Sequence, residues 1–215
     1  FYIHYLGMRP EWVDMTEVLR RMDQGIYDKE EFDRALYWVH KNCPEGMDPN
    51  PESRAHTAEQ KASEWEFVVK MTLIIRDLMT GNPKLAAIGF KEESLGRNAL
   101  FAGFQGQRMW TDYKPNADFT EAILNSTFDW RGKKQPTVFA TENDNLNGLS
   151  MMLGNLLTGR ASGFSDIRCY WSPDAVRRVT GWQPEGDAAG GFIHLINSGS
   201  TCLDASGKST DSQGN

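Results

Sequence analysis

The chain is poor in cysteine. Its three cysteines, Cys43, Cys169 and Cys202, are far apart and odd in number, which excludes a disulfide framework and a CxxC metal knuckle. His40 and Cys43 have the spacing of metal ligands on a helix, but no second pair of ligands lies near them in the sequence. We therefore interpret the cysteines as reduced and structural.

An excess of positive charge and a long apolar run are also missing. Lys and Arg number 23 against 29 Asp and Glu, for a net charge of −6, so there is no basic stripe to neutralise a phosphate backbone. No apolar run approaches the roughly 20 residues that a membrane helix needs. We expect neither nucleic acid nor membrane as a partner, and a cytoplasmic location.

The chain has no initiator methionine. It opens with the apolar run 1–6 and closes with the polar tail SGKSTDSQGN. Its 215 residues suffice for one good core, or for one domain with part of another. We expect an internal segment of a longer protein.

Hydrophobic periodicity divides the chain into alternating helices and strands. A capping box is predicted at Thr57 and Gln60, and Asn143 or Asp144 is expected to cap a later helix. The predicted helices are 14–24, 29–41, 57–79, 93–108, 118–124, 144–156 and 172–180. The predicted strands are 1–6, 136–141, 164–171 and 191–197. This alternation predicts an α/β fold with a mainly parallel sheet, and the glycine-containing break 158–163 suggests a domain boundary.

Two acidic residues follow or occupy predicted strands. Glu142 comes directly after the buried strand 136–141, at the edge where open α/β sheets usually bind ligands. The alternative is a solvated acid near a helix N-terminus. Asp166 lies on the strand 164–171, where the alternative is an edge aspartate paired with Arg168.

If these two carboxylates converge, they repel each other unless a cation lies between them. Oxygen ligands of this kind suit Mn²⁺ or Mg²⁺ better than zinc. Gln105, which lies between Gly103 and Gly106, has an amide that can donate to and accept from sugar hydroxyls. Its alternative role is to satisfy backbone groups as a buried amide.

Three motifs, GFQGQRMWTD, TENDNLNG and FSDIRCYWSP, contain these residues. They resemble the L-fucose isomerase family. GMRPEWVDMTEVLRRMDQGIYDKEE near the start and HLINSG near the end resemble it too, in the same order, so the resemblance covers essentially the whole chain. Ser165 and Ile167 depart from the family pattern but leave the carboxylate of Asp166 unchanged.

The resemblance implies a metal-dependent aldose–ketose isomerase that converts L-fucose to L-fuculose, and D-arabinose to D-ribulose, through an enediol. Glu142 and Asp166 would both bind Mn²⁺ and act as catalytic acid and base, and Gln105 would bind the sugar. The third metal ligand would be a histidine that is not on this chain, because none of its four histidines lies in a matching motif.

The resemblance also implies an architecture. Residues 1–158 would form an α/β middle domain, a three-layer and mainly parallel sheet with flanking helices, and residues 159–215 the start of a β-rich C-terminal domain. The enzyme would be a homohexamer whose sites are completed by a neighbouring subunit. The segment alone would be inactive. Two alternatives stay open: an L-arabinose-type isomerase of the same superfamily, and a sugar-binding relative without catalysis.

Overall fold

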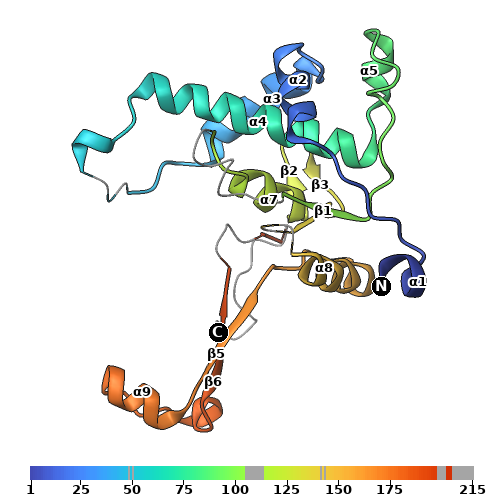
Figure 1. The fold of residues 1–215 in the computed structure, drawn as a ribbon. Coiled ribbons are helices and arrows are strands. Elements are labelled where there is room, and N and C mark those ends of the chain that lie inside the picture. The colour runs from blue at the N-terminus through green and yellow to red at the C-terminus, as the bar shows by residue number, and fades with distance from the viewer. Residues whose placement is uncertain are drawn as a thin grey trace. The chain divides into compact units, whose positions relative to one another are not determined.

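The computed structural model of the protein (Figure 1) describes residues 1–47, 49, 51–104, 114–140, 142, 144–197 and 202–204. The chain forms two compact units, Phe1–Ala99 and Leu100–Asn215. Helices are combined with small parallel and antiparallel sheets, so the predicted α/β class is confirmed at that level. Within the described ranges, none of the helices has the length and apolar character needed to cross a bilayer.

The first unit is helical. Its elements are α1 (Tyr2–Leu6), α2 (Met15–Asp23), α3 (Lys29–Asn42), the 3-10 helix η1 (Glu52–Arg54), α4 (Ala58–Thr80) and α5 (Pro83–Ala87). The long helix α4 packs against α2 and α3 (Figure 1). The capping box predicted at its start is present, since Thr57 and Gln60 each accept a hydrogen bond from the other's backbone N–H. The sequence therefore correctly placed the main helix of this unit.

A buried ionic cluster joins α3 to α4. The Arg76 guanidinium donates to both carboxylate oxygens of Glu31, at 2.6 and 2.9 Å, and to Oδ1 of Asp77 at 2.7 Å. Asn82 donates to the other oxygen of Asp77 at 2.9 Å. Burial raises the pKa of the Asp77 carboxyl, while Arg76 and Asn82 act in the opposite direction. These charges lie in the interior and satisfy one another there.

A second, more exposed cluster fixes α2. The Arg20 side chain donates to Glu17 at 2.8 Å and to Glu93 at 2.8 Å, and Arg21 donates to Glu17 at 2.7 Å. The hydrogen bond from Arg20 lowers the pKa of Glu17 from its ordinary 4.5 to about 2. Glu17 is therefore an acid whose charge contributes to folding.

Two sequence predictions in this part of the chain were wrong. Residues 1–6 form the helix α1 and no strand, because the amide of Tyr5 bonds to Phe1 and the chain closes at Gly7, whose φ is 64°. This short run satisfies its own backbone without a partner strand. Of the helix predicted at 93–108, residues 93–104 form turns and a strand, and 105–108 lie outside the described residues. Arg97 and Ala99 donate their N–H groups to carbonyls near the end of α4, so tertiary contact overrides the helical pattern.

The described residues of the second unit form three two-stranded sheets. Its elements are β1 (Phe101–Gly103), α7 (Asp118–Asn125), β2 (Phe128–Asp129), β3 (Gly132–Lys133), β4 (Val138–Ala140), α8 (Asn145–Thr158), β5 (Asp166–Trp171), α9 (Pro173–Thr180), the 3-10 helix η3 (Gly186–Ala188) and β6 (Phe192–Ile196). β1 pairs with β4 in parallel, whereas β2–β3 and β5–β6 are antiparallel. The strands predicted at 136–141, 164–171 and 191–197 are confirmed as β4, β5 and β6.

Strand β4 is buried along its whole length and bonded on both sides. One side pairs with β1. On the other side the Asn125 amide accepts from the Phe139 N–H at 2.9 Å and donates to the Phe139 carbonyl at 2.7 Å. Asn125 thus takes the place of a neighbouring strand, and it holds α7 beside β4.

Candidate functional site

Strands β1 and β4 end at the same edge of their sheet. They run parallel, with Gly103 opposite Ala140 as the last pair. In the sequence, Gln105 follows Gly103 by two positions and Glu142 follows Ala140 by two positions. The carboxyl edge of a parallel sheet is where ligands usually bind, so the register agrees with the placement expected from the sequence. Gln105 itself lies outside the described residues.

Glu142 has an unusual backbone conformation. Its φ is 53°, and among the described residues other than glycine only Asn98 shares a positive φ. Such a conformation is uncommon for a residue with a long side chain, and strained residues of this kind cluster at functional sites. The side chain is exposed, and within the described parts of the chain no hydrogen bond or ion pair engages its carboxylate. Glu142 is therefore open to a ligand.

The next acid has a structural role. Asp144 caps α8, and its Oδ1 accepts from the N–H groups of Leu146 at 3.1 Å and Asn147 at 3.0 Å. Of the two expected caps, Asp144 is therefore confirmed, and Asn143 lies outside the described residues. Because the Asp144 carboxylate is used at the helix end, Glu142 is the acid of this turn that can serve chemistry.

A glycine sets the distance between α8 and the sheet. Gly148 is buried, and a Cβ added to it would lie 2.8 Å from Cδ2 of Phe101 and 3.2 Å from Cβ of Ala140. The helix backbone thus rests directly on β1 and β4. Glu142 follows the end of β4 and precedes the start of α8, and the contacts of Gly148 fix these two elements against each other.

After α8 the chain turns back along that helix. The turn begins at Gly159, whose φ is 65°. The Asn155 amide donates to the Arg160 carbonyl at 2.9 Å, Ser162 lies against Gly154, and the Asn147 amide donates to the Ser165 carbonyl at 3.0 Å. These contacts run from the C-terminal end of α8 to its N-terminal turn. The chain therefore reaches Asp166 at the end of α8 that follows Glu142.

Asp166 is the first residue of β5 and is half-buried. Its Oδ2 lies 3.2 Å from Nη2 of Arg168, so the ion pair considered from the sequence is present. Asp166 pairs with Ile196 of β6, and the register shifts between Ile167 and Cys169. A β-bulge of this kind re-aims side chains and is frequent beside functional sites.

Two of the four histidines, His56 and His194, have side-chain partners of their own. His56 pairs with Glu64 at 2.7 Å, and His194 of β6 lies 3.9 Å from the sulfur of Cys169. In the part of the chain that the structure describes, no group of three His, Cys, Asp or Glu residues could hold a metal ion. Glu142 and Asp166 are two oxygen donors of the type that a hard divalent ion prefers, so they suit such an ion as part of a larger ligand set.

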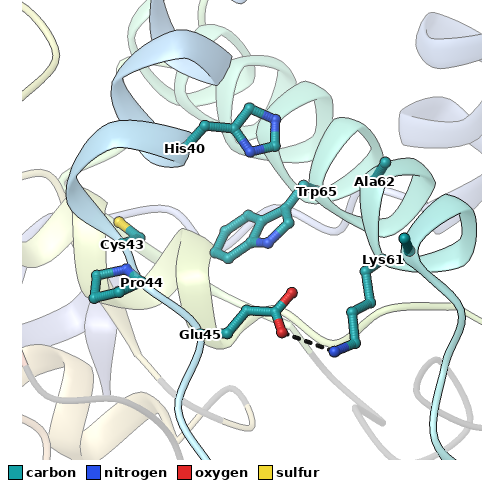
Figure 2. Close-up of a pocket in the computed structure, with 8 residues that line it drawn as sticks. His40, Cys43, Pro44, Glu45, Lys61, Ala62 and Trp65 are labelled. Carbon is teal, nitrogen blue, oxygen red and sulfur yellow. Dashed lines mark hydrogen bonds and ion pairs between the residues drawn. The ribbon is translucent and has the colours of Figure 1, made fainter.

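A pocket of about 300 Å³ lies in the first unit, between the end of α3 and the start of α4 (Figure 2). His40, Cys43, Glu45 and Trp65 are among its lining residues. The Glu45 carboxylate is paired with Lys61 at 2.7 Å, and burial raises the pKa of the Cys43 thiol. A protonated thiol and a neutralised carboxylate do not favour a metal ion, so this pocket supports the structural interpretation of Cys43.

Fold and geometry together define an α/β chain that carries two carboxylates near one end of a helix at a sheet edge. The model of the family "L-fucose isomerase, second N-terminal domain" matches residues 1–159. The chain belongs to the L-fucose isomerase family.

Curated relatives agree over the full chain. An L-fucose isomerase from Bacteroides fragilis is 58% identical over 216 residues, which cover 100% of this chain and 37% of that protein. One from Haemophilus influenzae is 58% identical over 100% of this chain and 36% of its own length. One from Streptococcus pneumoniae is 60% identical over 98% of this chain and 36% of its own length. The chain thus spans little more than a third of the curated relatives it matches.

Two residues that position the first part of α8 were not predicted from the sequence. Asn147 and Gly148 belong to the TENDNLNG motif, but their partners Ser165 and Phe101 lie far away along the chain. A glycine inside a strongly apolar helix was the available signal for close packing. Nothing in the sequence pattern indicated that Asn147 would bond to Ser165.

Proposed function

We propose that this chain is an internal segment of an L-fucose isomerase, which converts L-fucose to L-fuculose, and D-arabinose to D-ribulose, on Mn²⁺. Residues 1–158 would belong to a three-layer middle domain and 159–215 to the start of a β-rich C-terminal domain. The whole enzyme would be a cytoplasmic homohexamer, with sites completed by a neighbouring subunit. Identities of 58–60% to proteins named L-fucose isomerase support this proposal.

One structural observation carries the proposal: the chain returns along α8, from Arg160 to Ser165, to the helix end that follows Glu142. This return supports a site shared by Glu142 and Asp166, although they are 24 positions apart in the sequence. Asp144 already caps α8, so Glu142 is not required for that purpose. The exposed Glu142 carboxylate and its left-handed backbone have no such structural explanation.

In the proposed reaction, Glu142 and Asp166 act as an acid–base pair: one of them accepts the proton from C2 of the aldose, and the pair delivers a proton to C1. The hydroxyl proton on O2 is lost and O1 gains one, so the aldehyde becomes a hydroxymethyl group and C2 becomes the ketone. General acid–base catalysis of this kind contributes about 10²- to 10⁴-fold. A bound divalent cation would supply charge stabilisation for the enediolate oxygens. Gln105 would orient the sugar through its hydroxyl groups.

Substitution of Glu142 tests the proposal. In the complete enzyme, Glu142→Gln should reduce the isomerisation of L-fucose by at least about 10²-fold, while solvent proton exchange at C2 of the sugar falls in parallel. Glu185→Gln removes an exposed glutamate elsewhere in the second unit and should leave both rates unchanged.

The alternatives predict other results. Wild-type turnover in Glu142→Gln would reject the catalytic role of this residue. A preference for L-arabinose would favour the related isomerase, and a wild-type protein that binds L-fucose but catalyses no exchange would favour a non-catalytic relative.

A further inference from the structure

Asn147 makes a long-range contact that helix formation does not require. Its backbone N–H is already capped by Asp144, while its side-chain amide reaches out of α8 to the Ser165 carbonyl at 3.0 Å. The side chain is half-buried, and Ser165 directly precedes Asp166. The hydrogen bond therefore joins the first turn of α8 to the residue from which the peptide chain continues into Asp166.

The two ends of this hydrogen bond are unequally fixed. On one side, Gly148 rests on Phe101 and Ala140, so the first turn of α8 cannot move without disturbing β1 and β4. On the other side, Ser165 is exposed, and the buried Phe164 is the nearest anchor before it. Helix α8 is therefore the fixed partner. The hydrogen bond from Asn147 determines the position of the loop that contains Ser165.

We propose that Asn147 is a positioning residue for Asp166: it holds the Ser165 carbonyl against α8 and so fixes where the Asp166 carboxylate stands relative to Glu142. This inference rests on the proposed function, in which these two carboxylates bind one divalent cation. Outer residues that orient metal ligands typically change metal affinity by about 10- to 100-fold when they are removed.

Helix α8 provides a matched control. Asn155 makes the same kind of hydrogen bond, from its amide to the Arg160 carbonyl at 2.9 Å, but at the opposite end of the helix. The two asparagines are eight positions apart (155 minus 147), which corresponds to about 12 Å of helix. Asn147→Ala and Asn155→Ala each remove one amide-to-carbonyl bond of similar length, so a purely structural role predicts similar consequences for both variants.

The test is calorimetric titration of the complete, metal-free enzyme with Mn²⁺. We expect Asn147→Ala to weaken Mn²⁺ binding by about tenfold or more, Asn155→Ala to bind like the wild type, and Asn147→Gln, which retains an amide donor on a longer arm, to recover part of the affinity. If Asn147→Ala does not give a folded protein, Asn147→Ser takes its place in the same comparison.

Each outcome has a distinct meaning. Equal Mn²⁺ affinities for the wild type and Asn147→Ala would overturn the positioning role and leave the proposed function standing. Equal losses in the Asn147 and Asn155 variants would also overturn it, because the effect would then be one of helix stability. A wild-type enzyme that binds no Mn²⁺ would overturn both the positioning role and the proposed metal site.

Discussion

Two sets of acidic residues, one from each unit of the chain, differ in their surroundings. In residues 1–99, Glu31 and Asp77 are buried and bonded to Arg76, and Glu17 is bonded to Arg20 and Arg21. In residues 100–215, Glu142 is exposed, and the half-buried Asp166 is paired with the exposed Arg168. The comparison indicates that Glu17, Glu31 and Asp77 stabilise the fold through their arginine partners, whereas Glu142 and Asp166 are more accessible. The second unit also has a buried acid, Asp129, which is paired with Arg131.

The largest expected effect lies in the first unit. Arg76→Ala leaves Glu31 and Asp77 in the interior without their cation and should lower the free energy of unfolding by about 3–5 kcal/mol. Urea denaturation measures this difference. Arg97→Ala removes an exposed pair with Glu11 in the same unit and should cost less than about 1 kcal/mol. Equal losses of unfolding free energy in Arg76→Ala and Arg97→Ala would show that the buried cluster contributes no more to stability than an exposed ion pair.

In the second unit, the next largest effect is expected where the backbone of α8 packs closely against side chains of β1 and β4. Gly148→Ala places a Cβ 2.8 Å from the Phe101 ring and should lower the free energy of unfolding by about 1–3 kcal/mol. Gly163→Ala is the matched control, because a Cβ there meets no atom within 4 Å. Both variants are compared by thermal and urea denaturation. A Gly148 variant as stable as the Gly163 variant would show that α8 does not rest on the strands.

The Glu17 cluster gives a pH dependence. The folded pKa of Glu17, about 2, lies below its ordinary 4.5, so its stabilising contribution is present above pH 4.5 and is lost as the pH falls from 4.5 towards 2. Wild type should therefore exceed Glu17→Gln in stability at pH 6, and the difference should shrink at pH 3. Urea denaturation at the two pH values checks this, and a difference independent of pH would contradict it.

The smallest effect is expected at Arg168. Its pair with Asp166 is 3.2 Å long, and the arginine side chain is 53% exposed. Arg168→Gln should change the free energy of unfolding by less than about 1 kcal/mol in denaturation experiments. A loss of 3 kcal/mol or more would place Asp166 among the acids that stabilise the fold, and would remove its distinction from Glu17, Glu31 and Asp77.

Much of the local structure could be predicted from the sequence. The capping box at Thr57, the cap at Asp144 and the buried strand β4 follow from neighbouring residues, and the structure contains all three. The failures at 1–6 and 93–104 have a common cause. In both segments the backbone finds hydrogen-bond partners that periodicity does not encode: its own first turn in one case, the end of α4 in the other.

The candidate site was predictable only in part. The type and sequence position of Glu142 and Asp166 indicated a paired-carboxylate site, and the motif resemblance assigned them roles. The return of the chain along α8 could not be predicted, because it depends on contacts such as Asn147 with Ser165, 18 positions apart. Gln105 lies outside the described residues, so its role in sugar binding stays a prediction.

The central claim is that Glu142 and Asp166 bind one cation together. Crystals of the complete enzyme soaked with Mn²⁺ test it most directly, through anomalous diffraction near the manganese absorption edge. We predict one anomalous peak per subunit, within about 2 to 2.6 Å of carboxylate oxygens from both residues. A manganese peak that neither carboxylate contacts, or two carboxylates directed to different surfaces, would contradict the account.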